Sequence, residues 1–112
     1  MKIYHNPRCR KSREGVQYLT DKKLNFEIID YLKEGVSEDD IKSILKKLNM
    51  SAIEIVRKNE KIWKDNFKGK ELKEDQIISI LCEEPKLIER PIIVHKNKAV
   101  IGRPKENIDN LL

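Results

Sequence analysis

Residues 2–13, KIYHNPRCRKSR, carry the pattern that decides the fold: a short apolar strand, an Asn-Pro turn and the start of a charged helix. The helical pattern runs from about Ser12 to Lys23, and the β-branched and aromatic stretch 26–31 predicts a second strand. A strand, a helix and a strand within about thirty residues form a βαβ unit, so we expect the two strands to pair in parallel.

The middle of the chain has the spacing of helices. Ser37 followed by three acidic residues is typical of a helix N-terminus, and the stripe Ile41, Ile44, Leu45 and Leu48 predicts an amphipathic helix after it. Shorter helical segments are predicted at 51–58 and 60–65, and a further helix at 74–83.

The pattern changes again after residue 90. Residues 91–95 form a continuous apolar run that suits a buried strand, and 96–98 turn the chain into a second strand at 99–101. Gly102 ends this hairpin, and Pro104 suits the first position of a last helix. The predicted order is therefore βαβ, then helices, then ββα.

This order resembles the thioredoxin-like α/β fold, with a mixed four-stranded sheet and a helical insertion between its halves. We expect one domain over residues 1–112, with the insertion at about 35–88. Such a fold places a reactive cysteine after the first strand, at the N-terminus of the first helix. It also places a proline, usually cis, at the start of the third strand. Cys9 and Pro91 occupy these two positions.

The composition excludes several classes of protein. No apolar run approaches the length of about 18 residues that a membrane span needs, and the N-terminus meets a proline and charges instead of a signal-peptide core. We therefore expect no membrane association and a cytoplasmic location, where thiols stay reduced. The net charge of +5 arises from charges of both signs that alternate along the chain, so we interpret it as a solvated surface and expect no direct nucleic-acid binding.

The two cysteines, Cys9 and Cys82, cannot form a disulfide framework, and neither has zinc-type spacing, so we predict no metal site. Cys82 lies on a predicted helix beside Leu81 and is interpreted as a small apolar side chain. Cys9 is different, because a helix N-terminus and nearby cations both favour the nucleophilic thiolate. Four cations surround it in sequence: Arg8, Arg10, Lys11 and Arg13.

Two further side chains are expected to act on Cys9. Ser12 offers a hydroxyl where a Cys-x-x-Cys motif would have its second thiol, and His5 can hold the loop or add positive charge. The backbone amides that favour a thiolate also bind a tetrahedral oxyanion. Guanidinium groups match such oxyanions bidentately, so Arg90 and Arg103, each directly before a proline, and Arg57 from the insertion are candidate oxyanion ligands.

Four motifs in order carry a family likeness: His5-Asn6-Pro7-x-Cys9-x-x-Ser12-Arg13, Val56-Arg57-Lys58-Asn59, Ile88-Glu89-Arg90-Pro91-Ile92-Ile93-Val94 and Ile101-Gly102-Arg103-Pro104. The chain resembles the glutaredoxin- and glutathione-coupled arsenate reductases of the ArsC type over nearly its whole length. The resemblance implies a monomeric oxidoreductase with no bound cofactor, in which Cys9 attacks arsenate, glutathione acts as co-substrate and glutaredoxin as protein partner. It further implies that His5 and Ser12 activate the thiolate and that Arg57, Arg90 and Arg103 bind the oxyanion.

One departure leaves an alternative open. Well-studied members of the family carry small neutral residues around the cysteine, whereas this chain has Arg8, Arg10 and Lys11 there. Relatives of the same fold include general thiol-redox proteins and Spx-like transcription regulators that bind RNA polymerase, without arsenate reductase activity. Those regulators usually carry Cys-x-x-Cys, and Ser12 in place of the second cysteine speaks against that branch.

Overall fold

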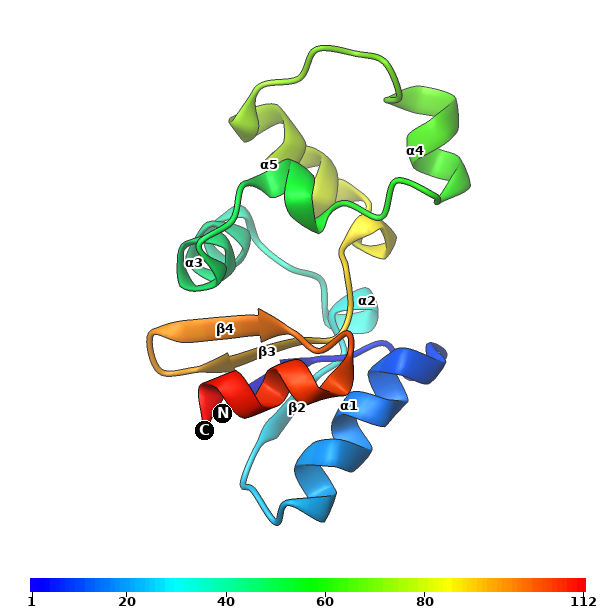
Figure 1. Ribbon diagram of the computed structural model, residues 1–112. Coiled ribbons are helices and arrows are strands. Elements are labelled where there is room, and N and C mark those ends of the chain that lie inside the picture. The colour runs from blue at the N-terminus through cyan, green and yellow to red at the C-terminus, as the bar shows by residue number, and fades with distance from the viewer. The chain divides into compact units, whose positions relative to one another are not determined.

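The computed structural model describes residues 1–112 (Figure 1). The chain divides into two compact units. The sheet unit comprises Met1–Glu34 and Arg90–Leu112, and the helical unit comprises Gly35–Glu89. None of the helices combines the length and the apolar character that a membrane-spanning helix requires.

The sheet unit contains a four-stranded sheet in the order β2-β1-β3-β4. β1 is parallel to β2 and antiparallel to β3, and β3 is antiparallel to β4. This mixed sheet confirms the thioredoxin-like α/β fold expected from the sequence. Its elements are β1 (Lys2–Tyr4), α1 (Arg10–Asp21), β2 (Glu27–Ile29), α2 (Tyr31–Glu34), β3 (Ile92–His95), β4 (Lys98–Ile101) and the 3-10 helix η3 (Lys105–Leu111).

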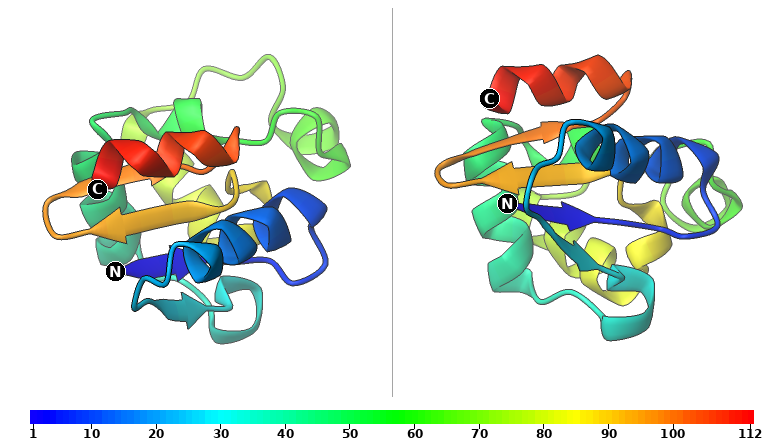
Figure 2. Two further views of the ribbon diagram at one scale, coloured as in Figure 1. Left: turned by 60° about the horizontal axis from the view of Figure 1, so that its bottom comes forward. Right: turned by 90° about the horizontal axis from the view of Figure 1, so that it is seen from below.

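One face of the sheet carries an apolar core. The register pairs Ile3 of β1 with Ile93 of β3, so both side chains point to the same face. Leu19 of α1 and Ile108 of η3 pack against them, and all four are fully buried. The two helices therefore lie on the same face of the sheet, as Figure 2 shows for α1 and the C-terminal helix.

Pro91 is packed closely between two glycines. A Cβ atom at Gly15 would lie 2.8 Å from Cγ of Pro91, and one at Gly102 would lie 3.0 Å from the same atom. The absence of a side chain at these positions lets α1 and the end of β4 approach the proline ring. The Arg90–Pro91 peptide bond is cis, and so is Arg103–Pro104.

The helical unit contains three α-helices and two 3-10 helices. The expected amphipathic helix is α3, whose stripe of Ile41, Ile44, Leu45 and Leu48 is buried. Ser37 caps it, because its hydroxyl accepts from the Asp40 amide at 3.0 Å. The elements are α3 (Glu38–Leu48), η1 (Ala52–Ile55), α4 (Lys61–Asn66), α5 (Glu74–Glu83) and η2 (Pro85–Leu87).

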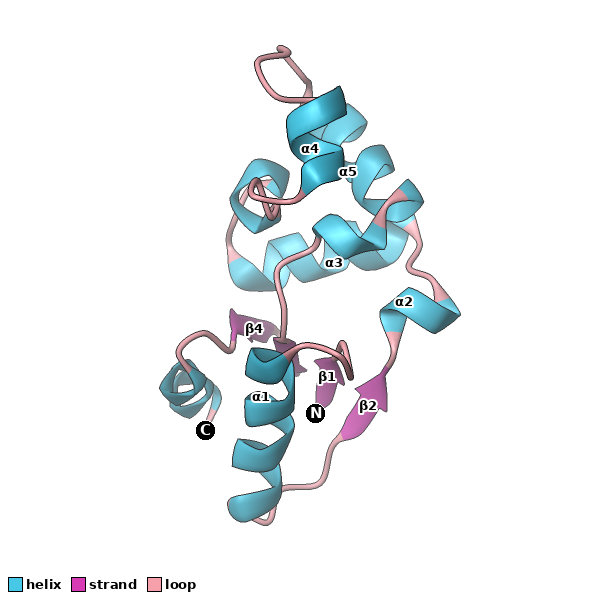
Figure 3. Cartoon of the chain, turned by 90° about the vertical axis from the view of Figure 1, so that its right-hand side faces the viewer, coloured by secondary structure: helices cyan, strands magenta, loops and turns pink.

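Several boundaries differ from those that the sequence predicts. α1 begins at Arg10 instead of Ser12, because the Cys9 carbonyl already accepts from the Arg13 amide at 3.0 Å. β2 ends at Ile29, since the Asp30 carbonyl accepts from the Glu34 amide at 2.9 Å and the chain coils into α2 (Figure 3). η1 stops at Ile55 because Val56 then bridges to Ile88. The last helix is a 3-10 helix that begins at Lys105, after Pro104.

Candidate functional site

Asn6 organises the loop that carries Cys9. Its side-chain oxygen accepts from the Arg8 amide at 3.0 Å, and its carbonyl accepts from the Cys9 amide at 3.0 Å. The side chain is buried, with 6% of its surface exposed. Asn6 was not among the predicted site residues. The Asn-Pro dipeptide is the signal that could have found it, since asparagine side chains commonly hold the backbone of such turns.

His5 and Ser12 form a buried pair beneath this loop. His5 Nδ1 lies 2.7 Å from Ser12 Oγ, which also accepts from the Asn6 amide at 2.9 Å. Burial lowers the pKa of His5, and the charge of Arg13 adds to this; Asp30 and the bond to Ser12 act in the opposite direction. The neutral imidazole therefore dominates near neutral pH. The observed contact of His5 is the hydrogen bond between its ring and Ser12.

Cys9 stands at the N-cap of α1, with its thiol partly exposed. No side chain caps this helix, and its first turn contains no acidic residue. The amides of that turn consequently remain available to an anion, and the positive end of the helix dipole favours one. This is the arrangement in which a thiolate or a tetrahedral oxyanion is stabilised.

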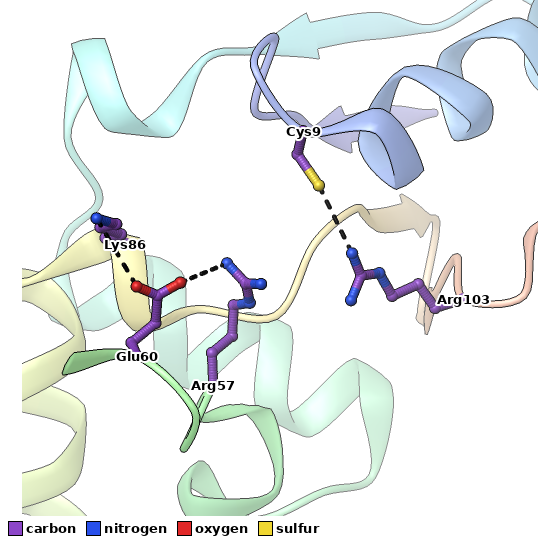
Figure 4. Close-up of polar contacts among 5 residues, drawn as sticks. All are labelled: Cys9, Arg57, Glu60, Lys86 and Arg103. Atoms are coloured by element: carbon purple, nitrogen blue, oxygen red, sulfur yellow. Dashed lines mark hydrogen bonds and ion pairs between the residues drawn. The ribbon is translucent and has the colours of Figure 1, made fainter. Parts of the chain in front are cut away.

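Arg103 is the cation that contacts the Cys9 sulfur. Its Nη2 lies 3.6 Å from Sγ (Figure 4), and its Nε–H is buried without a hydrogen-bond partner. Buried donors are nearly always paired in folded proteins. An oxyanion bound beside the thiol would accept a hydrogen bond from this unpaired N–H.

Three of the four cations near Cys9 in sequence have side-chain partners other than the sulfur. Arg10 and Lys11 both form ion pairs with Glu14, at 3.5 and 3.6 Å. Arg13 donates to the Pro7 carbonyl at 3.0 Å, and Arg8 is exposed. The guanidinium in contact with the sulfur instead belongs to Arg103, from the far end of the chain.

The other two candidate arginines lie in different units. Arg90 is a buried residue of the sheet unit, directly before Pro91. Arg57 belongs to the helical unit, where its Nη1 is paired with Glu60 at 2.9 Å. The sheet unit thus holds the candidate residues Cys9, His5 and Ser12 together with Arg90, Pro91 and Arg103, and the helical unit holds Arg57.

Cys82 has a different environment. It lies on α5, partly buried, and burial raises the pKa of its thiol, as do the charges of Glu38, Asp40 and Glu83. Both effects disfavour the thiolate. Both cysteines are free thiols, and no group of three or more His, Cys, Asp or Glu side chains is arranged to hold a metal ion.

These features define a thioredoxin-like protein with a single cysteine at the start of its first helix and an arginine whose guanidinium contacts the cysteine sulfur. The chain matches the model of the ArsC family over residues 4–111. It belongs to the ArsC family.

Similar proteins agree with this assignment. The arsenate reductase of Haemophilus influenzae is 36% identical over 112 residues, covering 98% of this chain and 97% of the relative. The Escherichia coli K12 protein YfgD, whose name states no activity, is 41% identical over 110 residues, covering 96% and 92%. The solved structure of the arsenate reductase from Vibrio cholerae superposes with a TM-score of 0.94 at 34% identity, covering 100% of this chain and 98% of the other.

Proposed function

We propose that this protein reduces arsenate to arsenite with Cys9 as its single nucleophilic thiol, using glutathione and glutaredoxin as reductants. The observation that carries the proposal is the contact of Arg103 Nη2 with Cys9 Sγ at 3.6 Å, beside a buried guanidinium N–H that has no partner. Membership of the ArsC family and the arsenate reductase names of several relatives support the choice of oxyanion.

In the first step, the Cys9 thiolate attacks the arsenic atom of bound arsenate. A sulfur–arsenic bond forms, an arsenate oxygen leaves as water after taking up protons, and arsenic remains in its higher oxidation state. The uncapped amides at the start of α1 and the Arg103 guanidinium stabilise the negative charge of the oxyanion. Arg90 and Arg57 are assigned to the same oxyanion by their positions in the family motifs.

In the second step, glutathione supplies the electrons. Its sulfur attacks Cys9 Sγ, and the electron pair of the sulfur–arsenic bond leaves with arsenic, which is thereby reduced by two electrons to arsenite. The two thiols are oxidised together to a mixed disulfide. A glutaredoxin thiol then attacks the glutathione sulfur and returns Cys9 to the thiolate. An external thiol is needed because the first helix carries Ser12 where a second cysteine would stand.

His5 and Ser12 act on the loop that presents the sulfur. Ser12 accepts from the Asn6 amide and contacts the neutral His5 ring, so the pair holds the turn that places Cys9 at the helix N-cap. No metal or bound cofactor enters any step, and the protein works as a cytoplasmic monomer in this proposal.

The test is a coupled assay in which arsenate-dependent NADPH consumption is followed with glutathione, glutaredoxin and glutathione reductase. The wild-type protein should consume NADPH only when arsenate is present. Cys9→Ser should abolish this activity, and Cys82→Ser should retain it. A wild-type rate equal to that of Cys9→Ser would refute the proposal. Disulfide exchange that does not depend on arsenate would favour the thiol-redox alternative instead.

A further inference from the structure

Arg57 belongs to a three-membered charge cluster within the helical unit. Glu60 Oε1 accepts from Arg57 Nη1 at 2.9 Å, while Glu60 Oε2 lies 3.7 Å from Lys86 Nζ (Figure 4). Each carboxylate oxygen of Glu60 thus faces one cation. These three side chains carry one negative and two positive charges.

The Arg57–Glu60 pair is partly buried and is held by the backbone. The exposed fractions of the two side chains are 20% and 19%, so salt screens this pair less than it screens a surface ion pair. The Arg57 amide donates to the Leu87 carbonyl at 2.7 Å, and the Glu60 amide donates to the Arg57 carbonyl at 3.1 Å. The pairing is therefore built into the turn that precedes α4.

Glu60 is an unusual residue for the position that it occupies. It is the N-cap of α4, where Ser, Thr, Asp and Asn are preferred because their short side chains bond to the helix amides. Glu60 makes no such bond. Its carboxylate is directed instead to Arg57 and Lys86.

We propose that Glu60 is an internal counter-ion that determines which anions Arg57 can bind. In the absence of substrate it neutralises the guanidinium. A doubly charged tetrahedral oxyanion displaces it from Arg57, whereas a singly charged anion competes poorly with an adjacent carboxylate. Lys86 keeps Glu60 paired after the exchange, so this partly buried carboxylate is not left without a cation. This inference rests on the proposed function, because it takes Arg57 as an oxyanion ligand.

Equilibrium binding measured by isothermal titration calorimetry tests this role without reference to turnover. Arsenate and nitrate serve as the doubly and singly charged probes. Glu60→Gln keeps the size and the hydrogen-bond acceptor but removes the charge, so it should bind arsenate about threefold to tenfold more tightly and should gain measurable nitrate binding. Lys86→Met should bind arsenate more weakly than the wild-type protein. In this variant Arg57 is the remaining cation of the cluster beside Glu60, so arsenate displaces Glu60 from Arg57 less readily.

Asp65→Asn is the matched control. Asp65 lies on the same helix, α4, and forms an exposed ion pair with Lys61. The substitution removes one negative charge from the same helix, as Glu60→Gln does, but it does not remove a partner of Arg57. Its arsenate affinity should equal that of the wild-type protein. The counter-ion role is overturned if the wild-type protein binds arsenate measurably and Glu60→Gln binds it no more tightly.

The inference and the proposed reaction can fail separately. Tighter binding by Glu60→Gln together with no arsenate reduction in the coupled assay supports the counter-ion and refutes the reaction. Absence of arsenate binding in the wild-type protein and in every variant overturns both.

Discussion

Nη2 of Arg103 lies 3.6 Å from Sγ of Cys9, although 94 positions separate the two residues in sequence. The contact joins the start of α1 to the segment between β4 and η3. Both belong to the sheet unit, and η3 packs on the same face of the sheet as α1. The sheet therefore brings the sulfur and the guanidinium together.

Replacing Arg103 by Lys should lower kcat/KM for arsenate about tenfold, although the charge is kept. A hydrogen bond to a charged group contributes about 1.5–3 kcal/mol, and an ammonium group cannot reproduce the planar fork of donors. The coupled NADPH assay measures this loss. Arg8→Lys is the control, since Arg8 is adjacent to Cys9 in sequence but its side chain is exposed and is not the one in contact with the sulfur. Equal kinetics for Arg103→Lys and the wild-type protein would assign Arg103 a purely structural role.

The two thiols should differ in reactivity towards iodoacetamide. The raised pKa of Cys82, caused by burial and by Glu38, Asp40 and Glu83, leaves it in the unreactive thiol form near neutral pH. We expect Cys9 to be alkylated first, with Cys82 modified only as the pH rises. Peptide mapping by mass spectrometry after timed labelling distinguishes the two sites. Faster labelling of Cys82 at neutral pH would contradict this expectation.

His5 should make the stability of the protein depend on pH. Burial lowers the pKa of His5 below its ordinary value of 6.5. At a pH between the two pKa values, the unfolded chain therefore binds a proton at His5 that the folded chain does not bind. The free energy of unfolding should therefore fall as the pH drops below about 6.5. Urea denaturation at about pH 7.5 and about pH 5.5 measures this fall. His5→Gln should show a smaller fall over the same interval, and an identical fall would argue against His5 as its source.

Gly15→Ala should destabilise the protein, although alanine is normally the better residue in a helix by about 1 kcal/mol. The new methyl group would lie 2.8 Å from Cγ of Pro91 and 3.5 Å from Cδ1 of Ile3, and overpacking of this kind costs about 1–3 kcal/mol. Urea unfolding measures the change. Thr20→Ala, at an exposed position of the same helix, should leave stability equal or higher. A stabilised Gly15→Ala variant would show that the proline ring can move away.

The elements that were predicted well are those with local causes. The α3 helix is one example: its cap at Ser37 and its buried stripe from Ile41 to Leu48 depend on residues three and four apart. The apolar run at Ile92–Val94 likewise indicated a buried strand before its partners were known. Boundaries were predicted less well, because the end of β2 and the length of η1 depend on hydrogen bonds that compete with the local pattern.

In the candidate site, too, features with local causes were predicted and features that depend on distant residues were not. The sequence by itself determined the position of Cys9 at the start of a helix, since the strand, the Asn-Pro turn and the helical pattern are all local. Only the tertiary structure decided which charges act on it: Arg10 and Lys11 pair with Glu14, whereas Arg103 contacts the sulfur. The pairing of Arg57 with Glu60 was equally absent from the sequence prediction. Interactions between exposed charges are largely screened beyond about 8–10 Å at moderate salt, and they weaken with distance. The fold sets these distances and the competing partners, so it decides which of the many cations in the sequence contacts the thiol.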